Sequence, residues 1–272
     1  MLYGRQSGFW TNYSCQTALI RILHCWISAI DTNEIVGTLL LDLSKAFDLV
    51  NHNILLQKLK LYGFHSSAVK LFSSYLSNRT QQTYSSSVSS SPGNVVSGVP
   101  QGSVLGQTMF LIYINDMSLG LSKSIADIFA DDSIISSQSK HFEELTLTFS
   151  EDLNKIDHCC NFNDMTINVT KSKVMFVTSK HNHRIIPQDW YIPGISYVKP
   201  LIYNVSKLLG VTIDNTLSWS THVDSVINKC NTYIYIYIYF IPNKIIFVCW
   251  NPQAILQCID FTPFWLSLYY LG

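Results

Sequence analysis

Two adjacent aspartates, Asp131 and Asp132, interrupt an apolar stretch and constrain the fold more than any other feature of the sequence. The residues before and after them predict two buried strands joined by a tight turn: Ile125, Ala126, Ile128, Ile134 and Ile135. Because side chains alternate along a strand, both carboxylates cannot enter the core from one face. Burying such a pair is costly unless a cation offsets the repulsion. The turn is therefore either a solvated Asp-Asp turn or part of a divalent-metal site.

Apolar spacing divides the rest of the chain into helices and strands. We expect helices over residues 14–29, 53–62, 104–117 and 142–162, one that is capped by Ser66 or Ser67, and one that begins near residue 219. We expect strands over residues 35–41, 173–178 and 207–213, a strand pair within 80–88, a turn at 92–93, and short strands and loops over 181–206. Ser14 is the expected N-cap of the first helix, and Gly63 is expected to end the second.

Two further stretches place polar or flexible residues at the ends of these elements. Asp42 directly follows the buried strand at 35–41, at the sheet edge where sites are usually built. The loop at 97–103 contains two glycines and a proline and leads into an apolar helix. Glycine lets the backbone approach a ligand closely, and a helix N-terminus can face an anion. The alternative for this loop is a plain connection to a core helix.

The net charge does not indicate a binding partner, but the charged residues are unevenly distributed along the sequence. The 272 residues carry 18 basic and 18 acidic side chains, so net charge does not point to a polyanionic partner. No acidic residue occurs between Asp48 and Asp116 or between Asp164 and Asp189. The basic residues in these two gaps are Lys58, Lys60, Lys70, Arg79, Lys171, Lys173, Lys180 and Arg184. They form either a basic groove beside an acidic centre or only solvated faces.

Cysteine spacing and the chain ends suggest a compartment. The seven cysteines are irregularly spaced and form no CxxC pair, so neither a zinc site nor a disulfide framework is indicated. No signal peptide is visible, and we expect an intracellular protein, in the nucleus or the cytoplasm.

Residues 233–239 alternate Tyr and Ile, which indicates repeat-derived DNA and high β-propensity. The hydrophobic tail over 233–272 is interrupted, so no membrane span is expected.

Three motifs occur in a fixed order: Leu-Asp-Leu-Ser-Lys-Ala-Phe-Asp at 41–48, Gly-Val-Pro-Gln-Gly-Ser-Val-Leu-Gly at 98–106 and Phe-Ala-Asp-Asp at 129–132. With Lys-Ser at 171–172 and Leu-Leu-Gly-Val at 208–211, they resemble the reverse transcriptase of non-LTR (LINE-like) retrotransposons of the jockey type. The similarity covers about residues 5–230.

The resemblance implies an α+β fold, the right-hand polymerase, in which helices flank an antiparallel palm sheet. It implies partial fingers over residues 1–34, a palm over 35–215 with an inserted fingers segment at about 53–97, the start of a truncated thumb at 216–232, and the hydrophobic tail.

The resemblance also implies roles for individual residues. Asp42, Asp131 and Asp132 would be the catalytic, metal-binding carboxylates, with Asp131 the more direct ligand. Two Mg²⁺ ions, or Mn²⁺, would serve nucleotidyl transfer. The implied nucleotide-binding residues are Phe47, which would screen the sugar 2′ position, Gln101, Gly102 and Lys171. The implied template or primer contacts are Pro100, Ser103, Leu209 and Gly210. The substrates would be an RNA template, a DNA primer and dNTPs, with no specific protein partner and no membrane.

The sequence departs from the family pattern at two positions within the resemblance. Relatives carry Gly-Phe-Arg near the start, where Trp10 follows Phe9 here, and they carry proline where this chain has Gln107. The upstream fingers elements and the endonuclease of intact elements are not in the sequence. Two interpretations follow: an RNA-directed DNA polymerase domain, or a decayed copy that at most binds nucleic acid weakly. An unrelated metal phosphohydrolase could use Asp116, Asp127 and His141, but no ligand spacing supports it.

Overall fold

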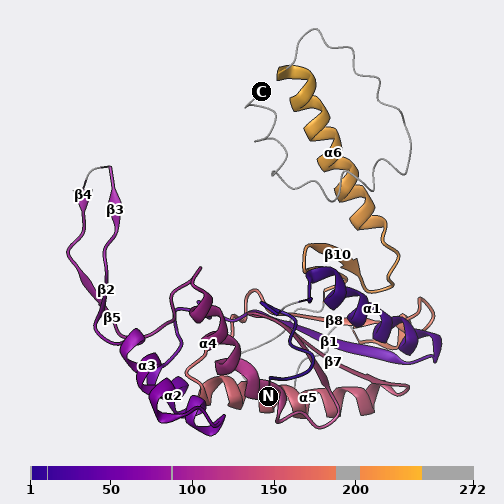
Figure 1. The fold of residues 1–272 in the computed structure, drawn as a ribbon. Coiled ribbons are helices and arrows are strands. Elements are labelled where there is room, and N and C mark those ends of the chain that lie inside the picture. Colours follow the sequence, from indigo (N-terminus) through magenta and orange to yellow (C-terminus); the bar gives the residue numbers. More distant parts are fainter. Residues whose placement is uncertain (1, 11, 87, 188–202, 241–272) are drawn as a thin grey trace.

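An antiparallel sheet forms the centre of the fold (Figure 1). The computed structural model describes residues 2–10, 12–86, 88–187 and 203–240. Within these residues the central sheet has four strands in the order β6-β7-β1-β8. They are β1 (Ile35–Leu41), β6 (Ile125–Phe129), β7 (Asp132–Ser139) and β8 (Lys173–Val177). The buried strands predicted around the paired aspartates and at 35–41 are confirmed.

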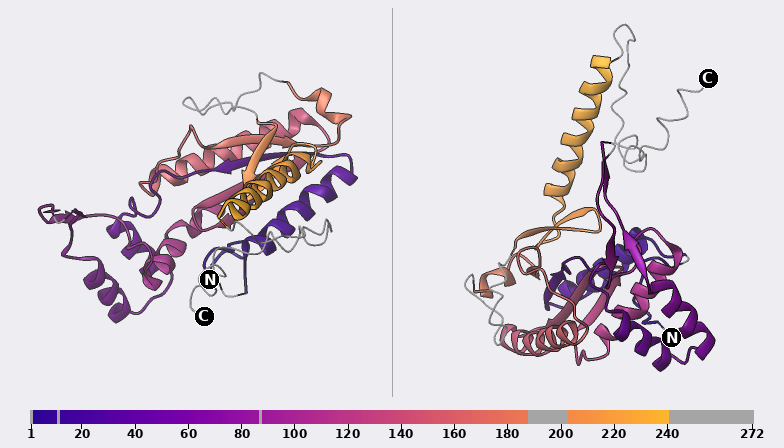
Figure 2. Two further views of the ribbon diagram at one scale, coloured as in Figure 1. Left: turned by 90° about the horizontal axis from the view of Figure 1, so that it is seen from above. Right: turned by 90° about the vertical axis from the view of Figure 1, so that its left-hand side faces the viewer.

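Helices cover both faces of this sheet (Figures 1 and 2). On one face, α1 (Cys15–Asp31) packs Ile22 and Trp26 against alternate sheet residues such as Val36 and Met175. On the other face lie α4 (Val104–Ile114), the 3₁₀ helix η1 (Asn115–Ser118) and α5 (Phe142–Phe162). β1 is almost entirely buried because it is covered from both sides. Apolar side chains pack on each face of the sheet, and these two cores fix the strand ends that carry the aspartates.

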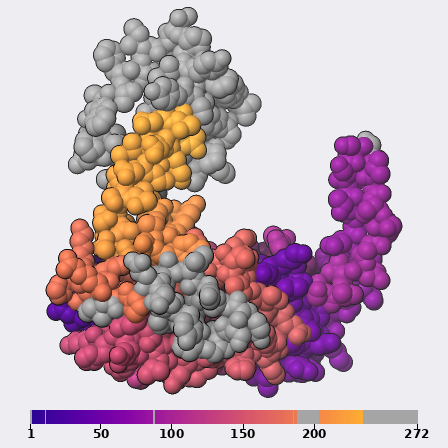
Figure 3. All heavy atoms as spheres, turned by 180° about the vertical axis from the view of Figure 1, so that it is seen from behind, coloured from indigo at the N-terminus to yellow at the C-terminus, as the bar shows by residue number. Residues whose placement is uncertain are grey.

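Two helices and a ribbon extend from one end of the body. The helices are α2 (His52–Leu61) and α3 (Ser66–Leu76). The ribbon consists of β2 (Arg79–Gln81), β3 (Tyr84–Ser85), β4 (Val88–Ser89) and β5 (Gly93–Val95). Since Gly93 pairs with Gln81, the predicted turn at 92–93 is wrong, and the strand pair extends well past residue 88. The ribbon projects from the same side of the body as the C-terminal helix (Figure 3).

Two expectations for the C-terminal part of the chain differ from the structure. The single strand predicted at 207–213 is a hairpin of β9 (Val205–Leu208) and β10 (Val211–Asp214). Leu209 and Gly210 both adopt positive φ, 45° and 91°, which reverses the chain between the two strands. The second correction concerns α6 (Ser220–Phe240), whose backbone stays helical through the Tyr-Ile repeat. Extending a helix that has already formed costs less than starting a strand without a partner.

Helix ends agree with the sequence to within two residues except at two points. Ser14 caps α1 as predicted, because its Oγ accepts a hydrogen bond from the Thr17 N–H at 3.2 Å. The cap of α3 is His65 and not Ser66 or Ser67, since the His65 ring accepts from the Ser67 N–H. The helix predicted to reach residue 117 ends at Ile114 and continues as η1.

A short 3₁₀ helix, η2 (Asn182–Ile185), follows β8. The rest of the predicted strands and loops at 188–202, and the tail at 241–272, lie outside the described residues. In the part of the chain that the structure covers, every helix is too short or too polar to cross a lipid bilayer. Five cysteines in this part are free thiols: Cys15, Cys25, Cys159, Cys160 and Cys230.

Candidate active site

The paired aspartates lie at the tip of the β6–β7 hairpin. Phe129 pairs with Asp132, so Ala130 and Asp131 form a two-residue turn. Ala130 adopts φ 56°, a conformation that residues with a Cβ rarely take. Asp131 and Asp132 are both solvent-exposed, while Ala130 and Ser133 are buried. The turn is therefore supported by buried residues, and it presents two exposed carboxylates at the edge of the sheet.

Asp42 lies at the same end of the neighbouring strand. In the antiparallel register, Leu41 pairs with Ser133, so Asp42 follows at the position opposite Asp132. Its backbone is held on both sides: its N–H bonds with the Ser172 hydroxyl at 3.1 Å, and its carbonyl accepts from the Asn168 N–H at 2.8 Å. The sheet thus brings together the three carboxylates that the sequence analysis selected.

The three carboxylates repel one another. Although the Asp132 side chain remains exposed, neighbouring protein atoms partly desolvate its carboxyl and raise its pKa, and the charges of Asp131 and Asp42 raise it further. Among the described residues, none of the three carboxylates has a lysine or arginine partner in an ion pair. Nor does any group of three or more His, Cys, Asp or Glu side chains in this part of the chain lie close enough to hold a metal ion by itself.

The loop before α4 packs against the segment that follows β1. The Val99 N–H donates to the Phe47 carbonyl at 2.9 Å, and a Cβ on Gly98 would lie 2.8 Å from the Asp48 carbonyl. The Gln101 side chain donates to Asp48 Oδ1 at 3.2 Å. Phe47 itself stacks on Phe110 of α4, with ring centroids 4.1 Å apart. Two motifs that are separated by about 50 residues in the chain therefore form one surface.

Individual residues of this loop have distinct roles in the local structure. Ser103 caps α4, because its Oγ accepts from the Gly106 N–H at 3.0 Å and donates to the Pro100 carbonyl at 2.9 Å. Gly102 has φ 80° and open space around it, and Gln101 is exposed. The loop is therefore fixed at Pro100 and Ser103, while its tip faces solvent.

Other predicted site residues are joined to the aspartates by no hydrogen bond or ion pair among the described residues. Lys171 is exposed, in the turn whose next residue, Ser172, bonds to Asp42. Leu209 and Gly210 form the β9–β10 turn, where Leu209 packs against the α1 side of the sheet. In the described part of the chain, no hydrogen bond or ion pair joins Lys171, Leu209 or Gly210 to the aspartates.

At least one of the basic residues in the two acid-free gaps belongs to the core and not to a groove. Lys58 is buried, 2.7 Å from Asp116, and it also donates to the Tyr113 carbonyl, so it belongs to the core. Burial lowers the pKa of Lys58, and the hydrogen bond with Asp116 opposes that shift. Lys173 lies over the Tyr203 ring. The charge pattern in the sequence could not separate such structural lysines from exposed ones.

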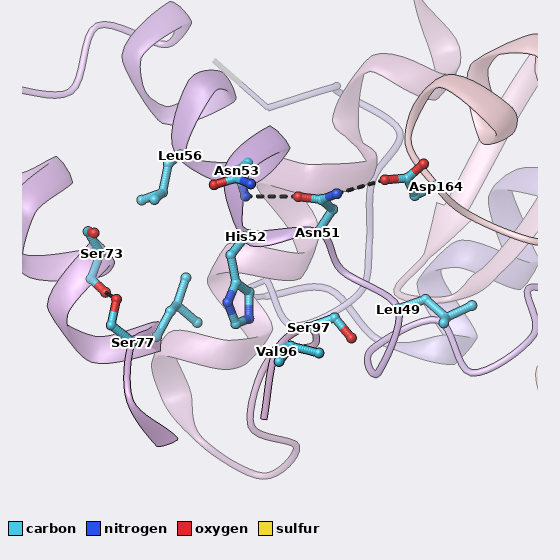
Figure 4. Close-up of a pocket in the computed structure, with 11 residues that line it drawn as sticks. Leu49, Asn51, His52, Asn53, Leu56, Ser73, Ser77, Val96, Ser97 and Asp164 are labelled. Carbon is cyan, nitrogen blue, oxygen red and sulfur yellow. Dashed lines mark hydrogen bonds between the residues drawn. The ribbon is translucent and has the colours of Figure 1, made fainter. Parts of the chain in front are cut away.

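A pocket of about 510 Å³ lies between α2, α3 and the loop at residues 96–97 (Figure 4). Asn51 bridges its rim, bonding to Asp164 at 2.7 Å, and the His52 ring bonds to the Gly98 carbonyl at 2.7 Å. None of the residues that line it is among the predicted site residues. The pocket is therefore separate from the edge that carries the aspartates.

The sequence assigned no element of its own to residues 5–8, and it gave no role to this segment. Gln6 forms a parallel bridge with Ile128 of β6, beside the paired aspartates. Arg5 and Arg21 both bond to the buried carboxylate of Asp127. The only available signal was the Gly-Phe pair at residues 8–9, in the position of the family's Gly-Phe-Arg. Trp10, which takes the arginine's place, is 49% exposed.

Comparison with known protein families decides the class of the chain. The family model described as "Reverse transcriptase (RNA-dependent DNA polymerase)" matches residues 4–213. The chain belongs to the reverse transcriptase family. The match includes the hairpin, Asp42, the loop before α4 and the segment at 5–8, so the site described above lies within the family domain.

Relatives of this reverse transcriptase domain come from fly transposons. It is 31% identical over 225 residues to the probable RNA-directed DNA polymerase from transposon X-element of Drosophila melanogaster. It is 28% identical over 231 residues to the RNA-directed DNA polymerase from the mobile element jockey of the same species. Each match covers 81% of this chain but only 24% of the relative. The resemblance predicted from the three motifs is confirmed.

Solved structures share the fold. The telomerase of Candida tropicalis, in complex with a fragment of telomeric RNA, matches 76% of this chain and 34% of its own at a TM-score of 0.51 and 14% identity. The apo form of that telomerase, truncated from its C-terminal domain, gives a TM-score of 0.51 at 13% identity. At such identities the likeness concerns the fold alone, and it agrees with an antiparallel, palm-like sheet flanked by helices.

Proposed function

We propose that this chain is the polymerase domain of a non-LTR retrotransposon and that it extends a DNA primer with dNTPs on an RNA template. One observation carries the proposal: Asp42 at the end of β1 and Asp131 and Asp132 in the neighbouring hairpin share one sheet edge in a chain of the reverse transcriptase family. In this proposal residues 35–215 form the palm, residues 1–34 and 53–97 contribute fingers, and residues 216–232 begin a thumb.

The carboxylates at this edge fit a divalent-metal site. The three carboxylates make the local electrostatic potential negative: desolvation raises the pKa of Asp132, and the charges of Asp131 and Asp42 raise it further. No ion pair among the described residues involves these carboxylates. Mg²⁺ is commonly bound by one or two carboxylates together with substrate phosphates, which agrees with the lack of an all-protein cage here. Asp42, Asp131 and Asp132 would hold Mg²⁺ or Mn²⁺. When bound, such ions activate the primer hydroxyl and stabilise the pyrophosphate leaving group.

Neighbouring residues would bind the substrates. Phe47 is fixed by its stacking on Phe110, so it can present a rigid apolar edge to the sugar of a nucleotide. Gln101 and Gly102 lie at the exposed tip of the loop before α4, where side-chain amide and backbone groups can reach a nucleotide. Lys171 would supply a positive charge for the triphosphate. Pro100, Ser103, Leu209 and Gly210 are proposed to contact the template or the primer end.

Primer extension by the full chain tests this function. The assay uses a DNA primer annealed to RNA with Mg²⁺, and the control is the double variant Asp131→Asn, Asp132→Asn, which keeps the shape of both side chains. We expect the parent to add dNTPs in the order that the template specifies and the control to lose at least about 100-fold in rate. If the parent is folded and adds no nucleotide with either Mg²⁺ or Mn²⁺, the proposal is wrong.

A second candidate is a catalytically inactive remnant, and Trp10 favours it. An arginine at this position would grip the triphosphate, and an exposed tryptophan cannot neutralise phosphate charge. The variant Trp10→Arg distinguishes the two. A remnant whose only defect is this residue would gain extension activity in Trp10→Arg, while an active parent would change mainly in its KM for dNTPs.

A further inference from the structure

We infer that residues 5–8, here called the N-terminal clamp, set the position of the turn that carries Asp131 and Asp132, with Gln6 and Gly8 as positioning residues. The consequence for catalysis rests on the proposed polymerase function, while the clamp itself rests on contacts within the chain. These contacts join the start of the sequence to a hairpin more than 100 residues away.

The backbone of the clamp lies along the edge strand β6. The Ile128 N–H donates to the Arg5 carbonyl at 3.2 Å, and the Ser7 N–H donates to the Ile128 carbonyl at 2.8 Å. These two bonds make the parallel bridge between Gln6 and Ile128, two residues before Ala130. The clamp therefore pairs with the strand that leads directly into the turn.

The Gln6 side chain reaches the turn itself. Its Oε1 accepts from the Gly8 N–H at 2.8 Å and from the Ala130 N–H at 3.4 Å. Gln6 is only 6% exposed, so little solvent competes for these bonds. Ala130 is the turn residue with φ 56°. Because a residue with a Cβ is strained there, an external partner for its N–H helps to keep the turn in this conformation.

Gly8 allows the clamp to approach the turn closely. A Cβ on Gly8 would lie 2.2 Å from the Ala130 nitrogen and 2.9 Å from its Cα, which are backbone atoms that cannot move without shifting the turn. Gly8 is not among the glycines with positive φ, so the position requires space and not glycine's conformational freedom. Gly4 lies just before the clamp, and a Cβ added there would meet no atom within 4 Å, so Gly4 offers a matched control.

Two arginines anchor the clamp to the body of the protein. Asp127 of β6 is 4% exposed and accepts from Arg5 Nε and Arg21 Nε at 3.0 and 2.9 Å. Arg21, from α1, also donates to the Arg5 carbonyl and to the Ser7 hydroxyl, both at 3.0 Å. The clamp is thereby fixed by α1 on one side and by β6 on the other, so it can act as a rigid support for the turn.

Three variants of the full chain test the clamp. Gly8→Ala pushes the turn, Gln6→Met removes the acceptor while keeping the side-chain length, and Gly4→Ala is the control. Hydrogen exchange of the amides at residues 128–132 measures how firmly the turn is held. Titration calorimetry with Mn²⁺ measures metal binding, and RNA-templated primer extension gives kcat and the KM for dNTPs.

We expect the amides at 128–132 to exchange about two- to twelvefold faster in Gln6→Met, the factor that one lost net hydrogen bond produces. In Gly8→Ala we expect weaker Mn²⁺ binding and a kcat lower by about 100-fold, the loss typical of a misplacement of about 1 Å, with a smaller change in KM. Gly4→Ala is expected to match the parent in every measurement.

Three results would overturn the inference. The first is equal exchange at 128–132 in the parent and all variants, and the second is faster exchange spread evenly over β1, β7 and β8, which indicates general destabilisation. The third is an active parent whose kcat is unchanged in both Gly8→Ala and Gln6→Met. If the parent itself extends no primer while exchange and Mn²⁺ binding change as expected, the polymerase proposal fails and the clamp stands.

Discussion

The Gln101 side chain donates to Asp48 Oδ1 at 3.2 Å, which joins the loop before α4 to the segment that follows β1. The same two segments also meet where Ser97 Oγ donates to the Asp48 carbonyl at 3.1 Å. Asp48 was part of a sequence motif, but no role followed from the motif. The structure connects it to Gln101, one of the residues proposed to bind the nucleotide.

The Asp48–Gln101 bond predicts an effect on nucleotide affinity. Asp48→Ala leaves Gln101 without its partner, so we expect the KM for dNTPs to rise by about fivefold, which corresponds to about 1 kcal/mol. Asp48→Asn keeps an acceptor oxygen and should change KM less. Steady-state primer extension measures both. Identical KM values for the parent and Asp48→Ala would mean that this bond does not position Gln101 for the nucleotide.

Asp127 is predicted to be important for stability because it neutralises two arginines. Asp127→Asn leaves Arg5 and Arg21 without a carboxylate, and we expect a loss of about 3 kcal/mol in the free energy of unfolding. Arg5→Met should cost less, since Arg21 still pairs with Asp127. Urea unfolding of the two variants checks this order, and a larger loss in Arg5→Met would contradict the account.

Asp132 is predicted to lower the stability of the metal-free protein. Its pKa is raised by partial desolvation of the exposed side chain and by the charges of Asp131 and Asp42, so its charged form is disfavoured in the fold. We expect Asp132→Asn to raise the free energy of unfolding at pH 7 by less than about 1 kcal/mol, because solvent screens exposed charges. Stabilisation by added Mg²⁺ should become smaller in the same variant. Thermal unfolding with and without Mg²⁺ measures both effects.

The lowered pKa of Asp214 leads us to expect that the protein loses stability in acid. Burial alone would raise its pKa, but bonds from Ser218 and Thr216 outweigh that effect and lower the pKa to about 2. A carboxyl whose pKa is lower in the folded state stabilises the protein above its unfolded pKa of about 4, and this contribution disappears as the pH falls through about 2.

The test of this acid effect is Asp214→Asn. At pH 7 we expect the variant to be less stable than the parent by about 1 kcal/mol, because charge-assisted hydrogen bonds are replaced by neutral ones. Between about pH 4 and about pH 2 the difference should shrink, as the parent loses its advantage. Urea unfolding at several pH values measures this, and a difference that stays constant over the range would contradict the assignment.

Local patterns in the sequence were sufficient for most elements and for the three carboxylates. The range 142–162, predicted from an apolar stripe, coincides with α5, and Ser14 caps α1 as expected. Asp42 and the pair at 131–132 stood out as charged residues at the ends of apolar strands, and the resemblance of the three motifs joined them into one proposed site. The strands and caps depend on neighbouring residues, so periodicity is enough to predict them.

The tertiary structure decided what depends on contacts between distant residues. Lys58 is a buried partner of Asp116, and only the packing of α2 against α4 and η1 determines that. The β9–β10 hairpin reverses the chain at Leu209 and Gly210, inside a range that periodicity predicts as one strand. In α6, helix extension outweighs the β-propensity of the Tyr-Ile repeat. Above all, residues 5–8 have no periodicity of their own. Their place beside Asp131 and Asp132 follows from a free edge on β6 and from the charge of Asp127.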